Sequence, residues 1–217
     1  MKKKHLYYIP LVCLFTLCLC SCKHQPSGIC HIQGVVDSDQ YEGKRIFLVP
    51  FTGPATAETV DSVEIKDRQF AFTTDTVQMY KILLDYHYRM GIQPLLIVGE
   101  PGVVKVTIGA VSHAVGTPQN DSLEQWKVRT ELRNQQLGEI HRRMMELGNP
   151  VSINKLKDRA DSINLAYKMM TRQMASNMKE GVLHEFLKSI YPTTFKKKLP
   201  VGRIVTINAD TNEEIPE

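Results

Sequence analysis

The period of the hydrophobic pattern changes once along this chain of 217 residues, near residue 117. Before that point, short apolar runs alternate at period two. After it, apolar residues recur every three or four positions. The first period is typical of half-buried strands and the second of amphipathic helices. We therefore predict an α+β chain: an N-terminal antiparallel β-sandwich or barrel-like sheet, followed by an α-helical hairpin and a short third helix.

The first part predicts a series of short strands separated by turn residues. Their spacing of roughly 8–12 residues is typical of a sandwich or barrel. The predicted strands cover residues 30–36, 44–49, 59–65, 69–73, 79–86, 95–98, 103–108 and 111–115.

Two long apolar stripes, at residues 123–147 and 153–174, predict the helices. Asp121 and Ser122 carry the signals for the start of the first helix. Between the stripes, Gly148-Asn149-Pro150 supplies a C′ glycine, an N-cap and an N1 proline, so we expect an antiparallel hairpin. A third helix is predicted over 181–190. We favour packing within the chain over a dimeric coiled coil, because each stripe has only about three heptads and Thr130 and Arg133 sit at seam positions.

The last stretch of the chain contains a basic run and a single predicted strand. Residues 202–207 predict a strand that either joins the sheet or stays loose. The basic run Lys196-Lys197-Lys198 predicts a solvated helix end or linker, with a contact to phosphate or a lipid headgroup as the alternative. The expected organisation is therefore a signal segment (1–21), a tether (22–29), the β-sandwich (30–116), a helical region (117–192) and a C-terminal tail with a strand in it (193–217).

The N-terminus has the layout of a secretory signal. Lys2, Lys3 and Lys4 precede an apolar run of about half the length that a transmembrane helix needs, and the run ends near Cys22. This junction resembles the lipobox of bacterial lipoproteins. The resemblance implies cleavage after Ser21, a diacylglyceryl thioether on Cys22 and acylation of the new N-terminus, for example by palmitate. An unlipidated signal is the alternative.

Processing would change both charge and cysteine content. Loss of the three lysines takes the formal charge from +4 to about +1, which argues against a nucleic-acid partner. It would leave Cys30 as the one unmodified cysteine, with no Cys-x-x-Cys and no intramolecular disulfide. We predict that Cys30 is a small buried hydrophobe at the start of a strand; a reactive thiol is the alternative.

Several short motifs carry a family resemblance. In order along the chain they are Gly43-Lys44-x-Ile46, Asp61-Ser62-Val63, Phe70-x-Phe72, Gly99-Glu100-Pro101-Gly102 and Gly116-Thr117-Pro118-Gln119-Asn120-Asp121. Over roughly residues 30–145 the chain resembles domain of unknown function 4369. The last motif, which opens a helix, is the most specific.

That domain precedes a thioredoxin-like domain in many lipoproteins of Gram-negative bacteria. We expect no thioredoxin-like domain in this chain, because the active-site Cys-x-x-Cys is missing. The resemblance therefore implies no redox activity and supplies no catalytic residue. The usual Asp-Gly-x-Phe hairpin also differs, since Arg68 stands where the glycine would be.

No residue pattern predicts catalysis, a cofactor or a metal site. The histidines are scattered without ligand spacing. Ser62 lies within a strand rather than at a nucleophile elbow. Asp61, Glu64 and Glu100 are expected to be solvent-facing charges. The aromatic cluster at 86–88 predicts edge packing, with ligand stacking as the alternative. Cys22 is thus the one predicted site residue.

These observations favour a non-enzymatic envelope lipoprotein. The membrane would be contacted through the lipid anchor, and a protein partner through sheet edges or the helices. We expect the outer membrane, facing the periplasm, because residues 23–26 lack an acidic cluster. One alternative is an accessory module of a thiol-disulfide or peroxide pathway that works with a separate thioredoxin-like protein. Another is an enzyme or small-ligand carrier with a pocket between sheet and helices.

Overall fold

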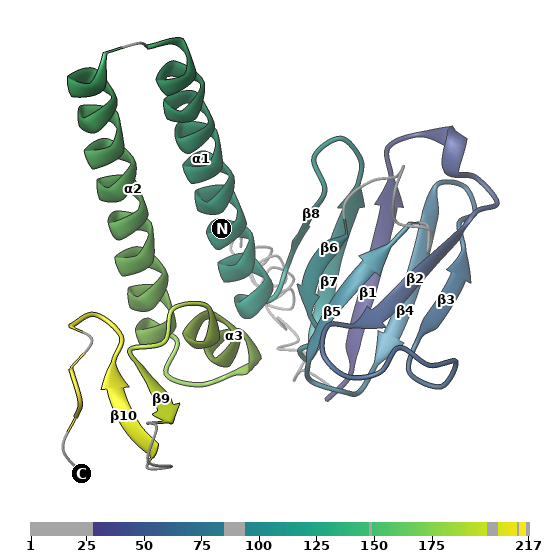
Figure 1. The fold of residues 1–217 in the computed structure, drawn as a ribbon. Coiled ribbons are helices and arrows are strands. Elements are labelled where there is room, and N and C mark those ends of the chain that lie inside the picture. Colours follow the sequence, from purple (N-terminus) through teal and green to yellow (C-terminus); the bar gives the residue numbers. More distant parts are fainter. Residues whose placement is uncertain (1–27, 85–93, 148, 199–203, 212, 216–217) are drawn as a thin grey trace, which may run out of the picture.

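The computed structural model describes residues 28–84, 94–147, 149–198, 204–211 and 213–215 (Figure 1). A strand-rich N-terminal part is followed by three helices and a small C-terminal β-hairpin. The elements are β1 (Cys30–Val36), a 3₁₀ turn η1 (Asp39–Tyr41), β2 (Arg45–Pro50), β3 (Asp61–Glu64), β4 (Gln69–Thr74), β5 (Met79–Leu83), β6 (Leu95–Val98), β7 (Gly102–Ile108), β8 (His113–Val115), α1 (Pro118–Glu146), α2 (Pro150–Asn177), α3 (Val182–Ile190), β9 (Thr194–Lys198) and β10 (Ile204–Asn208).

Two four-stranded sheets form a sandwich, as the alternating pattern predicts. Their strand orders are β4-β1-β7-β8 and β3-β2-β5-β6, and no closed barrel forms among the described strands. One pair departs from the antiparallel expectation: β1 and β7 run parallel, in register from Cys30–Gly102 to Val36–Ile108. β1 and β7 are far apart in the chain, so the local hydrophobic pattern does not indicate whether they pair parallel or antiparallel.

The sandwich core is apolar throughout and draws on both sheets. Buried and exposed residues alternate along all of β1, so one face of the strand is inside and the other outside. Gly34 leaves room for a neighbour, because a Cβ there would lie 1.9 Å from Cζ of Phe70 on the paired strand. The largest fully buried side chains in this core are Ile32, Ile46, Ile65, Ile82, Ile97 and Ile108.

The β3–β4 turn forms although Arg68 stands where the family resemblance implies a glycine. Asp67 and Arg68 have φ values of 51° and 58°, a region that side chains other than glycine disfavour. The Glu42 carboxylate accepts hydrogen bonds from both of their backbone N–H groups, at 2.8 and 3.0 Å. A remote acid therefore stabilises a turn that the local sequence alone would not favour.

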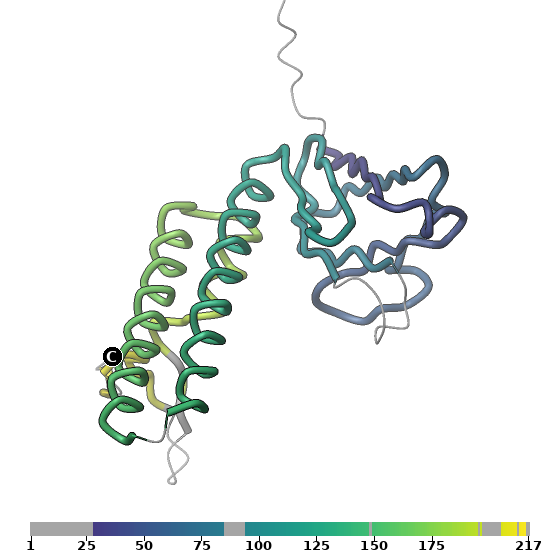
Figure 2. Tube along the Cα trace, turned by 90° about the horizontal axis from the view of Figure 1, so that it is seen from above, coloured from purple at the N-terminus to yellow at the C-terminus, as the bar shows by residue number. Residues whose placement is uncertain are grey.

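The helical hairpin forms as predicted, with one correction. Asn149 caps α2 through a 2.9 Å bond to the backbone N–H of Val151, and Pro150 takes N1. Helix α1, however, begins at Pro118 and not at Asp121, because its first turn is capped by a side chain outside the helix (below). Both views show the hairpin leaving one side of the sandwich and extending away from it (Figures 1 and 2).

The C-terminal prediction also needs correction. Strand β10 neither joins a sandwich sheet nor stays loose, but pairs antiparallel with β9. The basic run 196–198 is therefore part of a strand and not a helix end or linker. The lysine run is a strand because it pairs with β10, which begins at Ile204. The sequence of the run alone does not predict this pairing.

Candidate interaction site

The predicted lipidation residue, Cys22, lies outside the described residues, as does the aromatic cluster at 86–88. None of the described helices combines the length and the hydropathy that a bilayer span requires. Among the described residues, no group of three or more His, Cys, Asp or Glu side chains could hold a metal ion.

The strand residues considered for catalysis make local contacts. Ser62 accepts a hydrogen bond from Nη2 of Arg45 at 3.0 Å, and Asp61 accepts one from the Ser62 backbone at 2.7 Å. The contacts of Asp61 and Ser62 therefore stabilise the β2–β3 edge instead of pairing a nucleophile with a base.

Cys30 is the buried hydrophobe that the sequence predicts. It is 1% exposed at the start of β1. Burial, with a smaller contribution from the nearby Glu100 carboxylate, raises the pKa of its thiol to about 11. The nucleophilic thiolate is therefore a minor species at neutral pH, which argues against thiol chemistry at Cys30.

Glu100 is not the solvent-facing charge that we predicted. It is buried, and its carboxylate accepts hydrogen bonds from the backbone N–H groups of Gln119 (2.6 Å) and Asn120 (3.2 Å) in the first turn of α1. A carboxylate at a helix N-terminus satisfies free donors and interacts favourably with the helix dipole. Glu100 thus supplies from the β6–β7 loop the cap that the helix's own residues do not supply.

Asn120 ties the same turn to the edge of the second sheet. Its side chain is fully buried; Oδ1 accepts from the Val98 backbone N–H at 2.9 Å, and Nδ2 donates to the Val98 carbonyl at 2.7 Å. The side-chain amide therefore pairs with the outer edge of β6 as a neighbouring strand would. Nδ2 also donates to Oγ1 of Thr117 at 2.8 Å.

Gln119 extends this contact to the third helix. Its Nε2 donates to Glu100 at 3.0 Å, and its Oε1 accepts from the Leu183 backbone N–H at the start of α3. We call Glu100, Thr117, Gln119 and Asn120 the joint. Sequence reasoning singled out this motif without assigning its role, because the bonds join residues about 20 to 64 positions apart.

A second apolar cluster packs around the joint, between sheet and helices. Phe186 of α3 makes edge-to-face contacts with Phe51 and Trp126, at centroid distances of 5.5 and 5.7 Å. These three rings are partly buried and pack against the buried members of the cluster, which are Met79, Val98, Leu123, Ala175, Leu183 and Leu187. Side chains therefore pack where the ligand-carrier hypothesis would need a pocket.

The seam between α1 and α2 is largely polar near the joint. Trp126 donates to Thr171 at 3.3 Å, and Thr130 and Tyr167 share a 2.5 Å hydrogen bond. One turn further, Nη2 of Arg133 donates to Asn164 at 2.6 Å, and its guanidinium lies 5.0 Å from the Tyr167 ring centroid. Thr130 and Arg133, the residues that weakened the coiled-coil prediction, therefore link α1 to α2.

Beyond this polar seam, few side chains of α1 and α2 are buried. We call residues 134–146 and 150–163 the distal arm. Ile140 is its one buried residue, at 5% exposure, whereas Met145 and Val151 near the tip are 78% and 64% exposed. Helices in proteins depend mainly on the packing of an apolar face, and this part of the hairpin lacks most of that packing.

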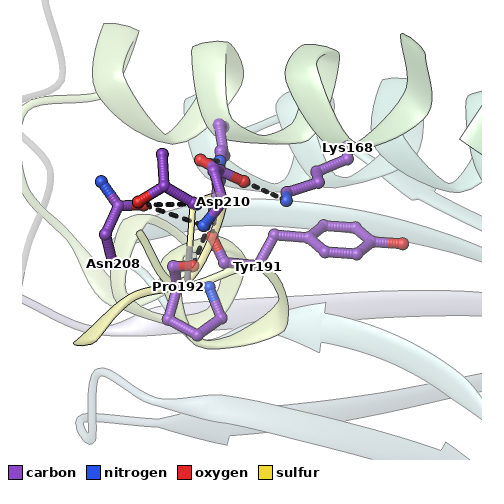
Figure 3. A network of polar contacts seen from close by, with 7 residues as sticks. Lys168, Tyr191, Pro192, Asn208 and Asp210 are labelled. Carbon is purple, nitrogen blue, oxygen red and sulfur yellow. Dashed lines mark hydrogen bonds and ion pairs between the residues drawn. The ribbon is translucent and has the colours of Figure 1, made fainter. Parts of the chain in front are cut away.

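The C-terminal hairpin is fastened to α2 by a charged cluster (Figure 3). Asp210 forms ion pairs with Lys168 and Arg172. Arg172 also donates to the carbonyls of Tyr191 (3.0 Å) and Pro192 (2.7 Å), which end α3. Hydrogen bonds from Lys168 and then Arg172 lower the pKa of Asp210. The cluster therefore attaches the C-terminal hairpin to α2 and to the end of α3.

Comparison with protein families bears directly on the sandwich and the joint. Residues 30–123 match the family model described as Domain of unknown function (DUF4369). This confirms the resemblance seen in the sequence motifs. The match ends at Leu123, so the matched segment includes the sandwich and the joint, while the rest of the hairpin lies beyond it. Neither a curated protein nor a solved structure matches the chain.

Proposed function

We propose that this protein is a lipid-anchored envelope protein whose DUF4369 domain presents the helical hairpin as a non-enzymatic binding arm. The observation that carries the proposal is the contrast between a filled joint and a distal arm with one buried residue. The polar residues at the joint bond to one another and to the backbone, so their role is to orient the arm.

The position of Ile29 supports an anchor at the base of the arm. The Gly102 backbone N–H donates to the Ile29 carbonyl at 3.1 Å, just after the loop that carries Glu100. A lipid on Cys22 would be at most about 25 Å from Ile29 along an extended tether. Helix α1, with 29 residues, is about 43 Å long, so the tip would lie well away from the base.

Lipidation is tested by metabolic labelling with a palmitate analogue. Wild type and Cys20→Ala should incorporate label and fractionate with membranes, whereas Cys22→Ala should lose both. Equal labelling of Cys22→Ala would contradict the anchor. Protease treatment of intact cells tests the periplasmic orientation: we expect the protein to survive until the outer membrane is permeabilised.

A further inference from the structure

A shallow apolar groove lies along one side of the distal arm. Its volume is about 250 Å³, and its apolar lining comes from both helices. Ile140 closes the floor at 5% exposure, whereas Leu132 remains 47% exposed. Leu156 and Ile163 of α2 are half-buried on the other side.

The rims of the groove carry an excess of positive charge. Glu139 is the one acid among the lining residues, and Nε of Arg143 donates to its carboxylate at 2.7 Å. Arg142 pairs with the same carboxylate. On the opposite rim, Arg159 forms no ion pair with any residue that the structure describes. Both rims therefore present guanidinium groups that a carboxylate could bind.

We infer that this groove binds an amphipathic helix of a partner protein, with apolar residues on one face and acidic residues beside them. Apolar side chains at i, i+3/i+4 and i+7 would cover Leu132, Ile140 and Ile163, the usual geometry of a helix in a groove. Flanking carboxylates would bind Arg143 and Arg159. The inference rests on the proposed function, since it assigns the chemistry of the partner that the arm binds.

A second copy of this chain fits the groove less well. Placing one groove against another would bring together two linings that each carry Arg143 and Arg159 against a single Glu139. Like charges facing each other across an interface disfavour the complex. The excess positive charge therefore favours an acidic partner over self-association.

The partner's chemistry can be tested in cells with a photo-crosslinking amino acid in the full-length protein. Gln136 lines the groove and is exposed; Leu165, two residues from Ile163, lies about 200° around α2 and serves as the control position. We expect position 136 to crosslink to a helical segment with acidic flanks, identified by mass spectrometry, and position 165 not to. Crosslinks to a second copy, to a segment without acidic residues, or at equal yield from both positions would overturn the inference.

A defined probe tests the same chemistry in vitro. We suggest a helical peptide of about 20 residues with leucines on one face and glutamates beside them, and a counterpart with lysines for glutamates. Fluorescence anisotropy with the purified protein should give about tenfold tighter binding of the glutamate peptide, lost in the Arg143→Glu/Arg159→Glu double variant. Leu165→Glu is the matched control and should bind like wild type.

Equal affinity for the two peptides, or unchanged preference in the double variant, would overturn the inference. The substituted arginines lie at the surface of the groove, so loss of binding would not reflect a lost core. The Cys22→Ala labelling experiment tests the anchor independently of the groove. A negative result with the peptides would therefore leave the proposed anchor intact, and a negative labelling result would leave the groove inference intact.

Discussion

The sandwich and the distal arm differ in how their apolar faces are covered. In the sandwich each inward face meets another from the same chain, and residues such as Ile32, Ile46 and Ile97 have no exposed surface. In the distal arm, two helices contact each other along one seam and bury only Ile140. The sandwich is therefore complete within one chain, whereas the distal arm retains surface that a partner could cover.

The joint explains how the two regions are connected. Glu100 and Asn120 attach the first turn of α1 to the β6 edge and the following loop, and both lie within the DUF4369 match. The matched segment therefore includes the residues that attach the arm to the sandwich, but not the distal arm itself.

Truncation of an apolar side chain should show the largest difference in unfolding free energy between the sandwich and the distal arm. Ile32→Ala leaves a cavity in the filled sandwich core and should cost about 3–4 kcal/mol of unfolding free energy. Leu156→Ala, at a half-buried position in the distal arm, should cost less than about 1 kcal/mol. Chemical denaturation measures both. Similar losses for the two variants would show that the arm is as well packed as the sandwich.

Loss of the buried Asn120 side-chain amide should have the next largest effect on stability. Asn120→Ala leaves the Val98 N–H and carbonyl without the bonds that they make at the β6 edge, and we expect a loss of about 2–3 kcal/mol. Gln125→Ala, on an exposed position of the same helix, is the control and should change stability by less than about 0.5 kcal/mol. If the two variants were equally stable, Asn120 would not connect the regions.

The capping charge should have a smaller effect. Glu100→Gln keeps an oxygen acceptor but removes the negative charge beside the start of α1, so we expect a loss of about 1 kcal/mol. Hydrogen exchange should show the change as faster exchange in the first turn of α1, with the strands unaffected. Uniformly faster exchange would instead mean that Glu100 supports the whole sandwich.

The attachment of the C-terminal hairpin should be the weakest and should depend on pH. The pKa of Asp210 is lowered in the folded protein, so its contribution is complete above its unfolded value of about 3.9 and is lost as the pH falls through the folded value. Hydrogen exchange in β9 and β10 should therefore accelerate in acid before that of β1. In Asp210→Asn it should already be fast at neutral pH; protection equal to wild type would rule out this role.

The elements that were predicted correctly are those set by nearby residues. The Asn149-Pro150 start of α2 is an example, because cap and first turn lie within three positions. The start of α1 was misplaced because its cap, Glu100, lies 19 residues before Gln119 in the chain. For the same reason the sequence predicts a surface charge at Glu100, which is buried, and does not predict the strand that includes 196–198. The joint motif was visible, but its role depends on contacts made by the folded chain.

Hydrogen exchange of the purified protein measures whether the distal arm opens more easily than the sandwich. We predict that amides of 134–146 and 150–163 exchange orders of magnitude faster than those of β1 and β7, because local opening is easy where few side chains are buried. Binding of the glutamate peptide should slow them selectively. Distal-arm protection equal to that of β1 and β7 without any partner would contradict the account.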